Sequence, residues 1–331
     1  MTKPKVAFYW CASCGGCEES VVDLAEDILD IINSVDIVFW PVALDFKRKD
    51  ILAMSDNNLA VSFINGAVRS SEQYDMVKLL RSKSQLVIAF GSCAQLGGIP
   101  GLANLFNRKE MLDTIYIKSP IVDNAKKVIP EEINNLPEGV LNLPYLWDTV
   151  KTLDQVIEVD YYLPGCPPPV SIVKEAFNAI LQGKLPEKGT VLAPDIALCE
   201  ECIYRESKPE KPVLHDFKRI HKINIEPEKC LLAQGLLCLG PATRKGCGAA
   251  CPSANMPCTG CMGPTSRVKD YGGKVISLLT SLVAANDEKE INESLNQIVD
   301  PVGTFYRYSL PASLIHRYYQ SNVIEDQNHE P

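Results

Sequence analysis

The sequence lacks the features that mark membrane proteins and nucleic-acid-binding proteins. No apolar run approaches the ~20 residues that are needed to span a bilayer. The N-terminal residues Met1–Lys5 offer neither a twin-arginine signal nor a separate hydrophobic signal region. The formal net charge is −8 over 331 residues, and no block of lysine and arginine stands out. We therefore expect a soluble, cytoplasmic protein that has no membrane span and does not bind nucleic acid.

Cysteine, in contrast, is abundant, with 13 residues in the chain. Cytosolic thiols are kept reduced, so metal ligation explains these cysteines better than a disulfide framework does. Five cysteines lie in the first 190 residues, and the other eight fall between Cys199 and Cys261. This change in composition predicts two domains, residues 1–190 and residues 191–331, with the boundary near Gly183–Pro194.

The first domain alternates predicted strands with predicted helices. Apolar runs and helical spacing give the following order: strand Val6–Trp10, helix Glu18–Asn33, strands Ile37–Val42 and Ala60–Asn65, helix Glu72–Lys83, strands Leu86–Phe90 and Val159–Leu163, and helix Ser171–Gln182. Residues 102–158 are less regular, and we expect an insertion there with one or two short helices. The alternation predicts an α/β fold with a parallel, doubly wound sheet.

The chain is organised around the stretch Trp10–Ser20, which places three thiols and two glycines on the turn from the first strand to the first helix. Cys14 and Cys17 follow the first strand, Cys93 follows the fourth and Cys166 follows the last. The carboxyl ends of parallel strands lie at one edge of a sheet, so these four thiols are expected to converge. Four cysteines on three loops suit a 4Fe–4S cluster.

Other interpretations of these residues are less favoured. Cys14 and Cys17 form a C-x-x-C pair, which alone would also fit a thioredoxin-like redox pair or a zinc site. Cys93 and Cys166 at matching strand ends disfavour the redox pair. A phosphate-binding loop is disfavoured because neither G-x-G-x-x-G nor G-K-[ST] occurs here. Cys11 is the surplus thiol and is expected to be a small buried residue. Glu18 adjoins Cys17 and could have a polar or proton-handling role.

The second domain has eight cysteines, which can form two sets of four and hold two further 4Fe–4S clusters. The three-ligand run of two-cluster ferredoxins is absent, and two zinc tetrahedra also remain possible. Frequent prolines indicate that the region depends on its bound groups to fold. A helix is expected at Ile276–Ala285 and a charged connector at Asp287–Glu293. The four histidines (His215, His221, His316 and His329) are expected to pack or to lie at the surface.

Several motifs resemble those of NiFe hydrogenase small subunits over nearly the whole chain. They are Trp10–Glu18, Gly91–Ala94, Pro164–Pro168, Gly240–Thr243 and Pro257–Cys261. The resemblance is closest to the cytoplasmic, methanogenesis-linked group that reduces viologen but not a deazaflavin and passes electrons to heterodisulfide reductase. It implies a flavodoxin-like domain with a proximal cluster, followed by an irregular iron–sulfur domain with two more. It also implies that Val302–Leu314 packs on a partner or on the first domain.

The resemblance assigns three 4Fe–4S clusters to twelve cysteines. These are Cys14, Cys17, Cys93 and Cys166 for the proximal cluster, Cys199, Cys202, Cys230 and Cys238 for the distal cluster, and Cys247, Cys251, Cys258 and Cys261 for the medial cluster. Periplasmic relatives commonly have histidine where Cys199 stands, so the distal cluster should be held by cysteine alone. Many relatives have proline at the position of Cys251 together with a 3Fe–4S medial cluster, so a fourth thiolate implies a 4Fe–4S cluster here.

Nothing in the sequence resembles the paired C-x-x-C motifs that hold the nickel–iron centre in the large subunit of this family, so the resemblance implies that dihydrogen is split on a separate large subunit. By resemblance, electrons would then pass through the three clusters to a small iron–sulfur acceptor subunit and a flavin-containing heterodisulfide reductase. Glu18 would lie at the interface with the large subunit.

Three alternatives to this identification remain. One is the cluster-bearing subunit of NADH:quinone oxidoreductases, against which the eight-cysteine domain argues. The second is the small subunit of a deazaflavin-reducing hydrogenase. The third, from a different class, is a zinc-stabilised interaction module.

Overall fold

A five-stranded parallel sheet forms the centre of the first half of the chain. The computed structural model describes residues 3–284 and 287–317. The strands are β1 (Lys5–Trp10), β2 (Asp36–Phe39), β3 (Leu59–Asn65), β5 (Ser84–Phe90) and β9 (Tyr161–Leu163), in the spatial order β2-β1-β3-β5-β9. Counted in chain order, this is the 2-1-3-4-5 order of flavodoxin-like folds. The predicted fold class is therefore confirmed.

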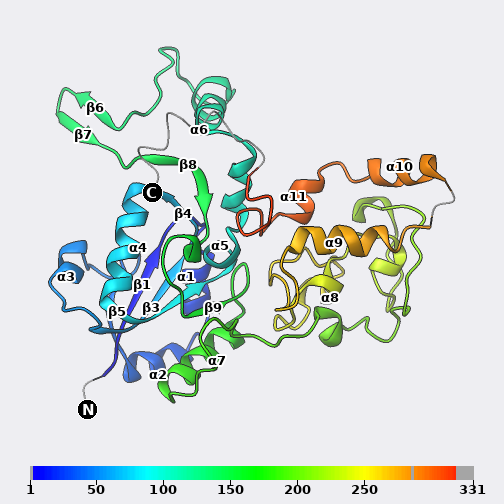
Figure 1. The fold of residues 1–331 in the computed structure, drawn as a ribbon, viewed down its shortest axis with the longest axis horizontal. Coiled ribbons are helices and arrows are strands. Elements are labelled where there is room, and N and C mark those ends of the chain that lie inside the picture. The colour runs from blue at the N-terminus through cyan, green and yellow to red at the C-terminus, as the bar shows by residue number, and fades with distance from the viewer. Residues whose placement is uncertain (1–2, 285–286, 318–331) are drawn as a thin grey trace.

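Both faces of the sheet are covered, which explains why its central strands are almost continuously apolar. On one face, Phe8 and Phe63 stack with ring centroids 5.1 Å apart, beneath helices α1 (Gly16–Val22), α2 (Asp27–Ser34) and α7 (Val170–Leu181). On the other face, Ile64 and Val87 are fully buried, beneath α3 (Arg48–Leu52) and α4 (Ser71–Lys83). Figure 1 shows this three-layered arrangement.

The predicted single helix Glu18–Asn33 is wrong, because the chain forms α1 and α2 instead. Ala25, between them, has φ +51°, a left-handed conformation that breaks the helix. The periodicity of the apolar residues continues across the break and therefore hides it. The predicted strand Ile37–Val42 ends early, at Phe39, shortly before Pro41, which has no backbone N–H to donate to a ladder.

The insertion is more ordered than the sequence predicts. It has short helical segments: the 3₁₀ helices η1 (Ile99–Leu105) and η3 (Leu153–Gln155), the α-helix α6 (Arg108–Leu112) and the π-helical turn η2 (Asp113–Lys118). It also has three strands that were not predicted: β6 (Ile133–Leu136), β7 (Gly139–Asn142) and β8 (Leu146–Lys151). β6 and β7 form a hairpin that projects from the body in Figure 1. β8 pairs antiparallel with β4 (Val68–Ser70).

The second half of the chain is irregular. Its longer helices are α9 (Tyr271–Thr280) and α10 (Glu288–Asn296), and its shorter ones are α8 (Ala250–Ser253), α11 (Pro301–Phe305) and the 3₁₀ turns η4 (Leu198–Glu201), η5 (Ile220–Lys222), η6 (Leu232–Gln234) and η7 (Gly240–Ala242). It has its own core, in which Leu232, Val275 and Leu310 are almost fully buried. The division at residues 190 and 191 stays a prediction.

Two elements of this half differ from the sequence prediction. The helix expected at Ile276–Ala285 begins earlier, at Tyr271, and ends at Thr280; Ala285 lies outside the described residues. The expected charged connector Asp287–Glu293 is wrong, because α10 covers most of it. Asp287 caps this helix by accepting a hydrogen bond from the backbone N–H of Glu290, at 2.9 Å.

Residues 305–317, here called the C-terminal strap, return to the first half of the chain. The backbone N–H of Gly98 donates to the carbonyl of Tyr308 at 3.0 Å. Asn104, which is fully buried, donates to the carbonyl of His316 at 3.0 Å. Of the two partners considered for Val302–Leu314, the structure shows contact with the first domain. Within the described ranges 3–284 and 287–317, no helix is both long and apolar enough to cross a membrane.

Close packing of Pro311 against Gly101 predicts the effect of adding one methyl group. A Cβ on Gly101 would lie 2.4 Å from Cδ of Pro311, so the strap would have to shift. Gly101→Ala should cost about 1–3 kcal/mol of stability and lower the midpoint of thermal unfolding by roughly 2–4 °C for each kcal/mol. Pro311→Ala removes the clashing ring atoms, so the double variant should recover most of the loss. If the two losses simply add, the strap does not pack in this way.

Candidate metal centres

The first set of cysteines consists of Cys14, Cys17, Cys93 and Cys166, and the carboxyl ends of the sheet strands bring it together. Cys14 lies on the β1–α1 loop, Cys17 is the second residue of α1, Cys93 lies on α5 (Ser92–Leu96) just after β5, and Cys166 follows shortly after β9. The segments that carry Cys93 and Cys166 are joined by a hydrogen bond, in which the backbone N–H of Ser92 donates to the carbonyl of Gly165 at 2.8 Å. Parallel pairing of β1, β3, β5 and β9 thus places the four thiols at one edge, as the sequence predicts.

Two glycines make room for these thiols. Gly91 has φ +88°, and a Cβ there would lie 2.3 Å from Sγ of Cys17. Gly98 has φ +58°, and a Cβ there would lie 2.3 Å from Sγ of Cys93. Only glycine combines this backbone conformation with such a close approach. The sequence pattern does not single out Gly98, because its role depends on the fold of the loop after α5.

Electrostatics at this set favour bound positive charge. Burial, followed by the neighbouring thiols of Cys166 and Cys14, raises the pKa of Cys93 to about 12. Burial raises the pKa of Cys17 even further, with Cys93 as the next cause. Such thiols stay protonated at neutral pH unless a metal stabilises the thiolate. The residues therefore fit an iron–sulfur group, whose iron ions would supply that charge.

Glu18 is buried beside the first set of cysteines. Its side chain is 5% exposed. Asn65 donates from Nδ2 to Oε1 of Glu18 at 2.7 Å, and the indole N–H of Trp40 donates to Oε2. Asn65 also accepts a hydrogen bond from the hydroxyl of Ser13 at 2.9 Å. The sequence predicts none of these partners, because Trp40 and Asn65 come from other strand ends. The expected role of Glu18 at a subunit interface stays a prediction.

This environment predicts a pH dependence for Glu18. Burial raises the pKa of its carboxyl group, and the hydrogen bonds from Trp40 and Asn65 oppose this only in part. The folded state therefore binds the proton more tightly than the unfolded state, whose pKa is about 4.3. As the pH rises above that value and through the folded pKa, the wild type should lose stability relative to Glu18→Gln. Thermal unfolding of both proteins across this range measures the difference, and a constant or rising difference would contradict the assignment.

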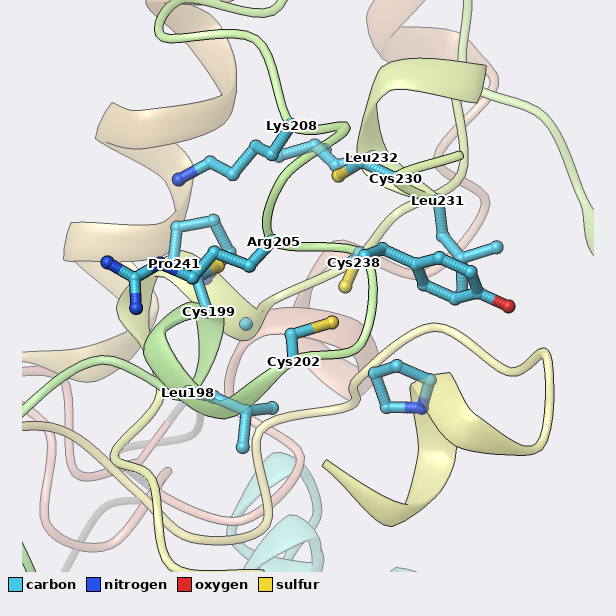
Figure 2. A pocket seen from close by; sticks show the side chains of 13 residues that line it. Leu198, Cys199, Cys202, Arg205, Lys208, Cys230, Leu231, Leu232, Cys238 and Pro241 are labelled. Atoms are coloured by element: carbon cyan, nitrogen blue, oxygen red, sulfur yellow. The ribbon is translucent and has the colours of Figure 1, made fainter. Parts of the chain in front are cut away.

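The second set consists of Cys199, Cys202, Cys230 and Cys238 and surrounds one hollow of about 420 Å³, including its opening. Figure 2 shows the four side chains around this hollow, with Arg205 and Lys208 beside them. Burial raises the pKa of Cys199 to about 11, the positive charge of Lys208 opposes the shift, and the other three cysteines add to it. The four thiols lie near one another, because all of them line the same hollow.

The third set consists of Cys247, Cys251, Cys258 and Cys261. Burial is the main cause that raises the pKa of Cys261, to about 11, and both Cys247 and Cys251 add to it. Cys258 is buried, and Cys251 is exposed on α8. Cys258 adjoins Cys238 of the second set as well as Cys261 of its own. The division of these eight cysteines into two sets of four, like the assignment of the first set and the role of all twelve as cluster ligands, stays a prediction.

The third set lies between the other two. The backbone N–H of Cys258 donates to Sγ of Cys238 in the second set, at 3.4 Å. On the other side, the hydroxyl of Ser92, next to Cys93, donates to the carbonyl of Cys261. Cys166 of the first set also influences the pKa of Cys261 directly. The spatial order is therefore first, third, second, although the order along the chain is different.

The remaining candidates lie apart from these sets. Cys11 is 5% exposed in the apolar core beneath α3 and α4, so the prediction of a small buried residue is confirmed. His215 and His221 are exposed. Nδ1 of His316 donates a hydrogen bond to the carbonyl of Pro311 at 2.8 Å, and His329 lies outside the described residues. In the part of the chain that the structure describes, no three cysteine, histidine or acidic side chains are arranged to hold one metal ion.

Comparison with known proteins gives consistent matches. The family described as NADH ubiquinone oxidoreductase, 20 Kd subunit, matches residues 14–180. The chain is 41% identical to the iron-sulfur subunit of the F420-non-reducing hydrogenase of Archaeoglobus profundus, covering 95% of this chain and 98% of that protein. It is 40% identical to the corresponding F420-non-reducing hydrogenase subunit of Methanothermobacter thermautotrophicus, covering 95% and 96%. The solved [NiFeSe]-hydrogenase of Dm. baculatum is similar in fold, with a TM-score of 0.51 and 16% identity over 86% of this chain and 100% of that chain.

Proposed function

This chain belongs to the small subunits of NiFe hydrogenases, within the group of F420-non-reducing enzymes. We propose that it relays electrons from dihydrogen oxidation through three 4Fe–4S clusters. The proximal cluster would be held by the first set, the medial cluster by the third and the distal cluster by the second. The large subunit would carry the nickel–iron centre, and the complex would work in the cytoplasm.

The spatial order of the three cysteine sets is the observation that carries this proposal. A relay needs its centres in a row, and the hydrogen bonds of Cys258 and Ser92 link neighbouring sets in that way. The Archaeoglobus profundus relative is named as an iron-sulfur subunit, which supports the same cofactor type. Iron–sulfur clusters supply one-electron chemistry, with potentials that depend on hydrogen bonds and exposure.

The residues of the chain would hold and shield these groups. Gly91 and Gly98 leave space for the thiols of Cys17 and Cys93. The backbone N–H groups of Ala249 and Ala250 lower the pKa of Cys247, although burial, the largest cause, raises it overall. Such backbone donors stabilise a thiolate ligand and help to set the properties of a bound cluster.

The acceptor is proposed from the family resemblance. Electrons would leave at the second set toward a small iron–sulfur subunit, and then reach a flavin-containing heterodisulfide reductase in methanogenesis. Of the alternatives, the NADH:quinone oxidoreductase subunit is disfavoured because that family match ends at residue 180, whereas hydrogenase relatives span 95% of the chain. The F420-reducing alternative is disfavoured by the relatives' names.

Anaerobic purification of the chain with its co-purifying proteins tests this function. We expect a nickel-containing large subunit and reduction of methyl viologen and a heterodisulfide with dihydrogen, but no reduction of F420. A preparation that contains the folded chain without a nickel protein and without hydrogen-dependent reduction would overturn the proposal.

A further inference from the structure

A groove on the second half of the chain carries positive charge, although the protein as a whole is acidic. The groove has a volume of about 1050 Å³, including its opening, and lies between residues 217–221 and residues 297–307. Lys218, Arg219, His221 and Arg307 line it, and no aspartate or glutamate is among its lining residues. The net charge of the chain is −8. We call this site the basic groove.

Its two arginines supply the surplus charge. Lys218 is partly neutralised by Asp216, at 3.5 Å. Arg219 and Arg307, in contrast, form no ion pair with any carboxylate in residues 3–284 and 287–317. Arg307 donates from Nε to the carbonyl of Gly303 at 3.1 Å, which fixes its side chain against α11. Unpaired guanidinium groups of this kind are well suited to carboxylates on a binding partner.

One wall of the basic groove is the backbone that carries two of the cysteine sets. Leu239, Pro257 and Thr259 line the groove, and each adjoins Cys238 or Cys258 in the sequence. The backbone N–H of Leu239 also donates to the carbonyl of Cys258 at 2.9 Å. A protein bound in this groove would therefore lie directly beside the proposed medial and distal clusters.

The groove also exposes apolar side chains. Met256 is 48% exposed and Val299 is 75% exposed, and both line it. A small anion would use the positive charge but not this apolar surface, whereas an acidic protein segment with apolar residues would use both. From the charge, the apolar rim and the position, we infer that the basic groove binds an acidic segment of the protein that accepts electrons from this chain. This inference rests on the proposed function, for which it names a docking site.

Binding of an acidic peptide tests the inference. The probe is a fluorescein-labelled peptide of glutamate with interspersed leucine, added to the anaerobically purified full-length chain with its large subunit, in the absence of acceptor. Its affinity should fall as salt is added, because exposed charges are screened. Reversing both charges in Arg219→Glu/Arg307→Glu should weaken binding by about tenfold or more, since charge complementarity at a binding site is lost.

Matched controls separate the groove from net charge. Lys49→Glu/Lys109→Glu changes the net charge equally, at exposed positions on α3 and α6, and should leave the affinity within about twofold. Arg219→Gln, at an exposed position, should give an intermediate loss if the double reversal does not fold. Equal binding by the groove and control variants, no binding by the wild type, or displacement of the peptide by ADP at similar concentration would overturn the inference. The iron content of the same samples reports separately on the electron relay.

Discussion

Replacing Cys93 by alanine should nearly abolish hydrogen-dependent reduction of the acceptor. Cys93 is buried among the other thiols of the first set, at the end of the sheet from which electrons would enter. Loss of a group that only supports a metal ligand typically costs about 10–100-fold in activity or metal affinity, so loss of a ligand itself should cost at least about 100-fold. The iron content should fall from about twelve to about eight atoms per chain.

Cys11→Ala is the matched control for this variant. Cys11 is also buried and directly follows β1, but it packs in the apolar core beneath α3 and α4. Its replacement should therefore leave the iron content and the activity near those of the wild type. If the two variants lose iron equally, the thiols of the first set are not specific ligands.

Replacing Cys251 by proline should convert the medial cluster to a 3Fe–4S form and raise its potential. Cys251 is the second residue of α8, where a proline is tolerated because the first turn of a helix leaves its N–H groups without helical partners. The variant would thus remove one thiolate without breaking the helix. The backbone carbonyl of residue 251, which accepts a hydrogen bond from the backbone N–H of Met256 at 2.9 Å, is kept in the variant.

Electron paramagnetic resonance of the oxidised Cys251→Pro protein measures this change. A new 3Fe–4S signal and the loss of about one iron atom of about twelve are expected. An unchanged spectrum would show that Cys251 is not a ligand. The wild-type protein, oxidised in the same way, is the reference.

The positions of the cysteines were predictable because the sheet is parallel. Once Cys14, Cys93 and Cys166 follow strands of one sheet, their convergence needs no knowledge of side-chain packing. The apolar runs predict the strands, and the glycines predict the turns that follow them. Both signals indicate the same parallel α/β fold.

Contacts between distant segments explain what the sequence could not predict. The partners of Glu18 come from β3 and from the end of β2, and nothing in the pattern of either strand marks Asn65 or Trp40 as a hydrogen-bond donor to it. The left-handed residue Ala25 breaks a helix whose apolar spacing continues unbroken. The order of the second and third sets in space depends on irregular loops, for which periodicity gives no signal.

The iron, acid-labile sulfide and zinc content of the anaerobically purified protein tests the central claim most directly. Three 4Fe–4S clusters predict about twelve iron and about twelve sulfide per chain, with little zinc. A colourless protein that contains zinc and no iron would contradict the account.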